Sequence, residues 1–462
     1  MAGFSSLGIG SGLNVDSIIT QTMKLERRPL DLLQAKINGT SSQISSYGQI
    51  KSAMSALYDA AKGLTDLDTW RGKQFTTGDK NFVTGATTSA ATAASFSLEV
   101  TRLAKAQSLA SGNFVSGAAM GADGQITLQK GRWDAAGTGF TAGSSGAVNI
   151  AISATDTLAD VAAKITQSGA GITAVVVKGA QGDRLLVRST ETGEENGFSM
   201  AASGGGSLDG LNGQSMTLTK AVDAEFIING MTVASASNTV KDVVPGVTLN
   251  LLKTTPEGAP VDISIGSDKD AIKNKIKSFQ EAFNKLNSLL RNLTSYDKDS
   301  KSSQPLQGDS TVRSLQSAMN SLMQQPGLNG ATLASLGLEM KLDSSFKNPT
   351  LSLNESKLDA ALNDLPKLEQ LLTGDGATEG LVTRIRDFAF AANGTNGDIT
   401  TRTKGLEALK KSNEGAVESM ELRLLQREQN LLKQYQALDA KMAGMSSLGS
   451  FLNAQIGQWN KG

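Results

Sequence analysis

The sequence predicts an α+β multidomain protein. Terminal coiled-coil helices and a helical bundle form a leg, and antiparallel β-rich head domains are inserted into it. Apolar residues at helical spacing occupy both ends of the 462-residue chain, while short runs rich in β-branched residues fill the middle. Helices from the two chain ends can pair into one bundle, so the β region is an insertion.

The N-terminal helical pattern extends from Val15 to Leu67, with apolar residues mostly three, four or seven positions apart. Pro29 predicts a break or kink, because proline has no amide hydrogen to donate within a helix. The stretch SQISSYGQIKSAMSALYDAAKGL then predicts one amphipathic helix that ends near Gly63.

The middle of the chain, from about Thr76 to Ser267, reads as short strands separated by Gly, Asn, Asp or Pro. Apolar and polar residues alternate in ASFSLEV and VDISI, which is typical of antiparallel strands with one buried face. One helix, DTLADVAAKITQSG, interrupts them and places Leu158, Val161 and Ile165 on one face.

The helical pattern returns at Ser267, where SDKD matches a capping box with Asp270 three residues on. An apolar stripe from Ile272 to Leu293 follows it and predicts a core-facing helix. Three further helices are expected, over Val312–Met323, Ser356–Leu372 and Thr378–Ala392.

The last helix is expected from near Thr403 to Trp459, about 80 Å at 1.5 Å per residue. Its apolar stripe is close to a heptad repeat, although Arg427 occupies an expected apolar position. Rods of this length are seldom needed in globular enzymes and are typical of assemblies.

These patterns divide the chain into seven segments. The predicted leg segments are a coiled-coil or disordered segment at 1–42 and a coiled-coil segment at 406–462. The predicted helical bundle has an N-terminal part at 43–75 and a C-terminal part at 268–405. The predicted β-rich head domain has a first part at 76–131 and a second part at 223–267, with an outer β-rich head domain inserted at 132–222.

The composition excludes most common chemistry. The chain has no Cys and no His, which removes disulfides, thiol nucleophiles and the commonest metal ligands and proton shuttles. We therefore expect no enzyme, no metal and no cofactor. Zero net charge argues against nucleic acid as a partner. The first residues lack the pattern of a secretory signal, which favours a cytoplasmic protein and leaves export without a cleaved signal open.

The glycine-rich opening, with Gly8, Gly10 and Gly12 before a helix, invites comparison with a phosphate-binding loop. No strand precedes it, and Asp16 would repel phosphate. Glycines also suit a segment that a partner orders, which is the interpretation we prefer.

Two acidic groups are further candidates. Asp297 and Asp299 have calcium-loop spacing, but the Gly and Glu that an EF-hand needs at its sixth and twelfth positions are missing. A solvated loop is therefore expected there. The group Glu191, Glu194 and Glu195 in ETGEEN could form an acid pair, but a turn between strands is the simpler interpretation.

Five stretches together carry a family resemblance. The opening SSLGIGSGLNVDSIITQTMKLERRPL, then LEVTRLAKAQSLAS, then DTLADVAAKI with GITAVVV and DRLLVRSTETG, resemble the bacterial flagellar filament cap protein family, a flagellar hook-associated family. LNESKLDAALNDLPKLEQLLTGDGATEGLVTRI and LLKQYQALDAKMAGMSSLGSFLNAQI resemble its C-terminal half. The match covers essentially the whole chain in family order.

The resemblance implies a structural cap, secreted unfolded by the flagellar type III apparatus to the distal filament tip. It implies a ring-like homo-oligomer that promotes folding and insertion of flagellin and prevents its loss to the medium. An export chaperone is expected at the C-terminal region, and cell adhesion is a further association. Lack of Cys and of a cleaved signal agrees with that route.

On this interpretation the terminal apolar stripes contact the filament or neighbouring subunits. The candidate contact residues are Ile18, Ile19, Leu33, Leu431, Leu438, Met442 and Leu452. Burial within the same subunit is the alternative for each of them. Two other functions stay open: a hook–filament junction protein of the same export system, and, more distantly, a carboxylate-based enzyme in the β region.

Overall fold

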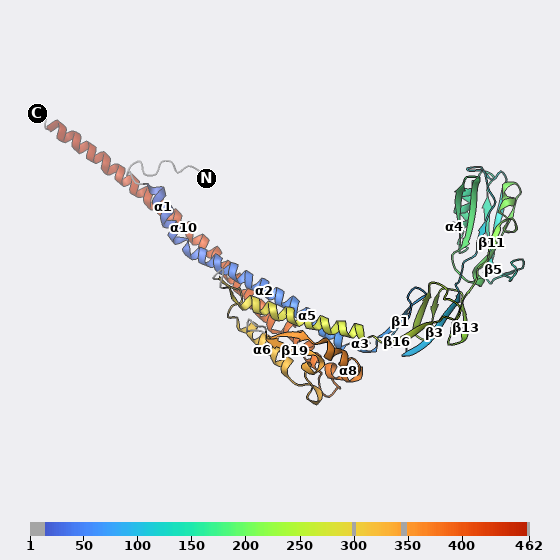
Figure 1. Ribbon diagram of the computed structural model, residues 1–462. Helices are drawn as coiled ribbons and strands as arrows, with labels where there is room; N and C mark the ends of the chain where they lie inside the picture. Colours follow the sequence, from blue (N-terminus) through green and yellow to red (C-terminus); the bar gives the residue numbers. More distant parts are fainter. Residues whose placement is uncertain (1–13, 298–301, 343–348, 460–462) are drawn as a thin grey trace. The chain divides into compact units, whose positions relative to one another are not determined.

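The computed structural model describes residues 14–297, 302–342 and 349–459. The chain divides into two compact units, a helical unit of residues 1–69 and 270–462 and a β-rich unit of residues 70–269 (Figure 1). Within the described ranges, no helix is both long and apolar enough to cross a membrane.

The helical unit is built around α2 (Arg28–Thr65), α5 (Lys269–Thr294) and the long α10 (Asp398–Trp459). Its smaller elements are α1 (Val15–Glu26), α6 (Ser310–Gln324), α7 (Glu355–Ala361), α8 (Leu365–Thr373), α9 (Leu381–Asn393), the 3-10 turns η4 (Leu328–Gly330) and η5 (Leu333–Leu336), and the hairpins β17 (Tyr296–Asp297) with β18 (Ser302–Ser303) and β19 (Leu338–Leu342) with β20 (Pro349–Leu353). The short α3 (Leu67–Arg71) leads toward the β-rich unit.

Prolines and caps set the helix boundaries. Asn14 caps α1 by accepting a hydrogen bond from the Ser17 amide at 3.0 Å. The predicted break at Pro29 is present, since Pro29 lies in the first turn of α2. The single helix expected over 356–372 is two helices, because Pro366 lies in the first turn of a new one, α8, which Asp364 caps.

Two sequence expectations at the ends of helices differ from the structure. Ser267 is the last residue of strand β16, and α5 begins two residues later, so Ser267 is one position too early to be the N-cap. The long C-terminal helix begins at Asp398 rather than near Thr403, and its 62 residues give it a length of about 93 Å.

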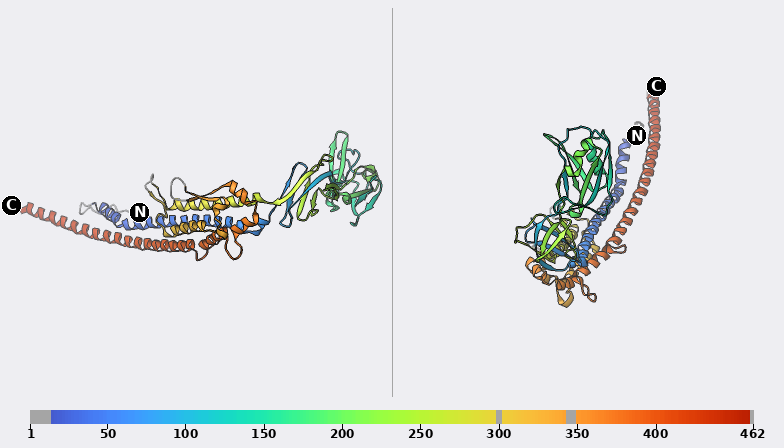
Figure 2. Two further views of the ribbon diagram at one scale, coloured as in Figure 1. Left: turned by 60° about the horizontal axis from the view of Figure 1, so that its bottom comes forward. Right: turned by 90° about the vertical axis from the view of Figure 1, so that its right-hand side faces the viewer.

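The core of the helical unit lies between α2, α5, α6 and α9. Its largest fully buried side chains are Tyr47, Ile50, Met54, Leu57 and Leu64 from α2 and Phe279 and Phe283 from α5. The β19–β20 hairpin is held on α5 by Asn284, whose amide exchanges two hydrogen bonds of 2.7 and 2.8 Å with the backbone of Leu351. Figure 2 shows these helices lying along one another.

The β-rich unit contains two hydrophobic cores. The first lies between a five-stranded sheet in the order β1-β16-β3-β12-β13 and a three-stranded sheet in the order β14-β15-β2. The strands are β1 (Lys73–Thr77), β2 (Val83–Thr87), β3 (Ala94–Arg102), β12 (Ala224–Ile228), β13 (Met231–Ser235), β14 (Thr239–Lys241), β15 (Val247–Leu251) and β16 (Val261–Ser267). The strand pairs are antiparallel, as the alternation predicted.

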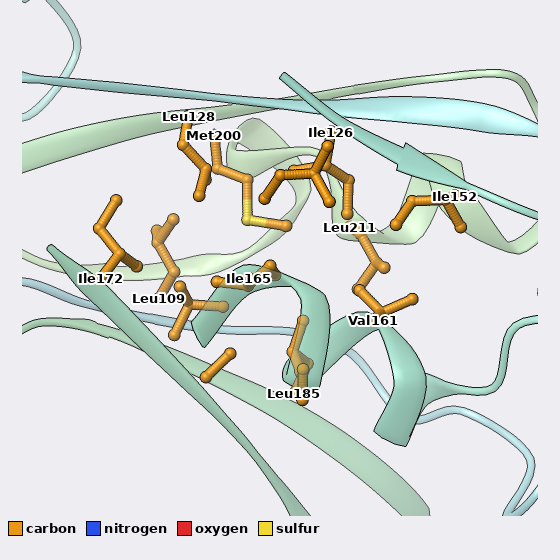
Figure 3. Close-up of a cluster of buried hydrophobic side chains, with 14 of the residues drawn as sticks. Leu109, Ile126, Leu128, Ile152, Val161, Ile165, Ile172, Leu185, Met200 and Leu211 are labelled. Carbon is orange, nitrogen blue, oxygen red and sulfur yellow. The ribbon is translucent and has the colours of Figure 1, made fainter. Parts of the chain in front are cut away.

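The second core packs α4 (Leu158–Gln167) against two four-stranded sheets (Figure 3). In one sheet β5 pairs with β6, β7 and β10, and in the other the order is β11-β4-β9-β8. Their strands are β4 (Ser108–Ala110), β5 (Gly124–Trp133), β6 (Phe140–Ala142), β7 (Val148–Ile152), β8 (Ile172–Gly179), β9 (Gly182–Ser189), β10 (Gly197–Ser203) and β11 (Thr217–Thr219). Three short 3-10 turns, η1 (Glu194–Asn196), η2 (Gly206–Leu211) and η3 (Gly213–Ser215), complete it. The predicted α4 face of Leu158, Val161 and Ile165 is buried in this core.

The chain changes cores earlier than the predicted division at 131/132. That division falls inside β5, whose Ile126 and Leu128 are buried in the second core. The chain passes from one core to the other between Arg102, the end of β3, and Ser108, the start of β4. It returns between β11 and β12, close to the predicted 222/223 division. The strand pattern marks the faces of β5 but not which sheet β5 joins.

Candidate functional site

The apolar seam between α1 and α10 is the first part of the candidate site. The two helices run antiparallel, side by side (Figures 1 and 2). Their shared cluster contains buried Val15, Ile19 and Met23 from α1 and buried Leu424 and Leu431 from α10. Spacings of four and seven residues place these side chains in one row on each helix. The seam is therefore an antiparallel two-helix coiled coil formed within one chain.

Arg427, which interrupts the predicted heptad stripe, has a partner in this seam. Its Nε lies 3.5 Å from Oε1 of Glu26, the last residue of α1. Both side chains are about half exposed, so the pair contributes little to stability. Its position marks which residues of α1 lie beside which residues of α10.

The apolar stripe of α10 continues beyond the seam, and there its side chains are exposed. Leu438 is 41% and Met442 is 37% exposed. The exposed apolar residues farther along α10 are Met445, Leu448, Phe451, Leu452 and Ile456. The stretch from 438 to 456 extends about 27 Å along the helix. Contiguous exposed apolar surface of this kind marks an interaction site.

The seven predicted contact residues fall into three groups. Ile19 and Leu431 are buried against each other's helix in the seam. Ile18 and Leu33 are half-buried. Leu438, Met442 and Leu452 are exposed on α10. The sequence pattern does not separate the buried positions of the stripe from the exposed ones, because burial depends on which residues of α10 are covered by α1.

A buried polar cluster holds the base of α10 to the helical unit. The Tyr47 hydroxyl of α2 donates a hydrogen bond of 2.7 Å to Oδ1 of Asp309. The Arg402 guanidinium of α10 donates to Oδ2 through Nη2 at 3.0 Å and Nε at 3.3 Å. Asp309 also caps α6, accepting from the amides of Thr311 and Val312 at 2.9 and 3.2 Å. One carboxylate thereby joins three helices.

The cluster shifts the pKa values of its members. Burial and the hydrogen bond to Asp309 raise the pKa of Tyr47. Burial alone would raise the pKa of Asp309, but hydrogen bonds from Tyr47, the Val312 amide and Arg402 outweigh it and lower that pKa. Burial alone would lower the pKa of Arg402, and the hydrogen bonds to Asp309 raise it. Sequence reasoning missed this cluster, because its members are 262 and 93 residues apart.

The other candidate sites lie partly outside the described residues, and their described parts show no ligand-binding arrangement. Gly8, Gly10, Gly12 and Asp299 lie outside the described residues, while Asp297 is in β17. ETGEEN forms the predicted turn, with η1 between β9 and β10. Among the residues that the structure describes, His, Cys, Asp and Glu form no group of three or more that could hold a metal ion.

Family models match three parts of the chain. The N-terminal model of flagellar hook-associated protein 2 matches residues 11–107, which include α1, α2 and the first strands. Its C-terminal model matches residues 221–447, which reach through the α1–α10 seam. A flagellin hook IN motif matches residues 135–191, around α4. A protein of Pseudomonas aeruginosa called A-type flagellar hook-associated protein 2 is 31% identical, over 94% of this chain and 93% of that one.

The chain belongs to the flagellar hook-associated protein 2 family. Another family member, from Escherichia coli K12, is 27% identical over 99% of this chain and 98% of its own length. The solved D1-D2-D3 domains of the flagellar cap protein FliD from Escherichia coli match with a TM-score of 0.57 and 28% identity, over 78% of this chain and 99% of that chain. These findings confirm the resemblance to the filament cap family and the predicted fold class.

Proposed function

We propose that this chain is a structural cap protein at the distal tip of the bacterial flagellar filament. On this proposal several copies form a ring-like homo-oligomer on the filament end, promote folding and insertion of flagellin, and keep flagellin from escaping. Membership in a family of flagellar cap proteins supports the cap function. The role is structural rather than catalytic.

The observation that carries the proposal is the exposed apolar stripe of α10 from Leu438 to Ile456. A helix stripe in water gains free energy only when another surface covers it, about 1.5–3 kcal/mol for each large side chain that becomes fully buried. The filament end and neighbouring legs are the surfaces that a cap meets. Leu438, Met442 and Leu452 are therefore the proposed contact residues.

The mechanism follows from the modest size of each contact. Similar apolar contacts can form at several positions on the filament, and each is weak enough to break. Insertion of one flagellin changes which positions fit, so the cap advances by releasing some contacts and forming others. Ile19 and Leu431 would act indirectly, since they keep α1 on α10 and support the exposed stripe.

Further partners belong to the same proposal. Export through the flagellar type III apparatus would make the protein secreted, and an export chaperone would bind the C-terminal region before export. The exposed side chains of α10 offer such a chaperone an apolar surface. Attachment to host cells is proposed only as an additional property.

Immunogold labelling of flagella tests the location. The experiment uses cells whose only copy of the gene encodes this chain with a short epitope between Gly143 and Gly146, an exposed loop. The proposal expects label at the distal filament end. Label confined to the hook–filament junction would contradict it and favour a junction protein.

A further inference from the structure

Each helix of the α1–α10 pair carries a second row of apolar residues outside the seam. On α1 and α2, Ile18, Leu25 and Leu32 recur every seven residues, and on α10, Leu422 and Leu425 are three residues apart. The four leucines are 55–66% exposed. Isolated exposed leucines need no explanation, but rows at heptad spacing are typical of helix surfaces that pack on other helices.

The two rows lie on opposite faces of the helix pair. One residue advances an α-helix by about 100°. Leu25 is six positions after Ile19, which places it about 120° from the seam around the axis of α1, against the direction in which the helix turns. Leu425 directly follows Leu424, which places it about 100° from the seam around the axis of α10, in the direction in which the helix turns. Because the two helices are antiparallel, rotations of opposite sign lead to opposite faces (Figure 1).

The exposed charges that continue the two rows at helical spacing have opposite sign, although Asp31 and Arg423 are also exposed next to them. Arg28 and Lys36 continue the row on α2 at spacings of three and four residues. Glu418 and Glu421 precede Leu425 on α10 at the same spacings. The Glu26–Arg427 pair marks the register, and counting ten residues from it in antiparallel directions places Lys36 level with Val417, the neighbour of Glu418. The basic row and the acidic row therefore occupy the same height of the leg.

The basic row ends in a hollow that can receive a side chain. Gly39 is seven positions after Leu32, and apart from its chain neighbours and its own helix backbone no heavy atom lies within 4 Å of a methyl group built on it. The hollow has a volume of about 400 Å³ and is lined by Lys36, Gly39, Thr40, Gln43, Leu409 and Asn413. A row of knobs followed by a hollow is a surface on which a second helix can dock.

We propose that these rows form a heterologous interface between two copies of this chain, with the α1–α2 row of one copy docked on the α10 row of the next. A second copy fits best because one chain holds both complementary halves, on opposite faces and at one height. Head-to-tail contacts of this kind form a ring when the rotation between neighbouring copies closes. The inference rests on the proposed ring-like cap and assigns the contact between its neighbouring legs.

Cysteine cross-linking tests the interface directly, because the natural chain has no Cys and introduced thiols are the only ones present. Full-length Leu32→Cys and Leu422→Cys copies are mixed and oxidised mildly with copper. We expect at least tenfold more disulfide dimer from the mixture than from either variant alone. Thr20→Cys mixed with Asn430→Cys is the control, because Thr20 of α1 and Asn430 of α10 are exposed but lie away from the two rows.

Charge reversal provides the second arm. Lys36→Glu in the Leu32→Cys copy should lower the dimer yield several-fold, and Glu418→Lys in the Leu422→Cys copy should restore it. Equal yield from the control pair, or equal self-linking of Leu32→Cys, would overturn the interface. Filament capping by the natural chain is measured separately in cells. Normal capping without the mixed dimer would reject this interface and leave the cap function standing.

Discussion

At the scale of single residues, Asp309 has the most consequential position in the helical unit. Its carboxylate accepts hydrogen bonds from Tyr47 of α2 and Arg402 of α10 and caps α6. The side chain is almost completely buried. A buried carboxylate of this kind stabilises the fold only while its partners are present, and removing it leaves Arg402 and the Tyr47 hydroxyl without their acceptor.

Asp309→Ala should therefore destabilise the helical unit by about 3 kcal/mol, combining a lost N-cap with a broken buried ion pair. Chemical denaturation followed by circular dichroism measures this. Asp364→Ala is the matched control, since Asp364 also caps a helix but is exposed. An equal loss from both variants would show that the contacts to Tyr47 and Arg402 contribute nothing.

The same carboxylate predicts a pH dependence. Its pKa is lower in the folded chain than the ordinary value of about 4 in the unfolded chain, so the unfolded chain takes up a proton first as the pH falls. The stability that Asp309 contributes is complete above about pH 4 and is lost as the pH falls through the folded pKa. The free energy of unfolding of Asp309→Asn should differ from that of the natural chain at pH 7, and this difference should shrink as the pH falls below about 4. An undiminished difference at low pH would contradict this assignment.

At the scale of elements, the α1–α10 seam separates side chains that stabilise one chain from side chains left for partners. The seam buries Ile19 and Leu431, while Leu438 and Met442 are exposed farther along α10. Isolated helices as short as α1 are marginal in water, so its helical structure depends on this packing. The same stripe thus has an internal part and an external part.

Ile19→Asp should release α1 from α10, because burying a carboxylate in the seam costs several kcal/mol. Hydrogen exchange of the α1 amides should become fast, while exchange in α2 beyond Tyr47 stays slow. Thr20→Asp places the same charge at an exposed neighbour and should leave exchange in α1 unchanged. Slow α1 exchange in Ile19→Asp would mean that the seam does not hold the helix.

Sequence periodicity predicted the elements whose signal is local. Pro29 marked the division between α1 and α2, and the α4 face was visible in its own spacing. Features that depend on distant chain segments were not predictable: the pairing of β5 with β10, the Arg427–Glu26 pair, and the Asp309 cluster. The exposed part of the contact stripe was identified only as part of a longer row, because exposure depends on where α1 ends beside α10.

At the scale of the whole molecule, both chain ends contribute to one helical unit and the middle of the chain forms a β-rich unit with cores of its own. A change on the C-terminal part of α10 therefore leaves the cores of the β-rich unit intact, since those cores contain no residue of α10. Loss of function from such a change would report on an external contact rather than on folding.

The most direct test of the cap account is Leu438→Asp, expressed as the only copy in flagellated cells. Leu438 is exposed, so the variant should fold, but a carboxylate there would oppose every apolar contact with the filament. Because α10 is also the proposed chaperone surface, export of the variant is verified by detecting it outside the cells. The account predicts short or absent filaments, poor swimming and unpolymerised flagellin in the medium. The control Gln436→Asp, an exposed position on another face of α10, should support normal filaments. Normal filaments and normal swimming with Leu438→Asp would contradict the claim that this stripe is the working contact.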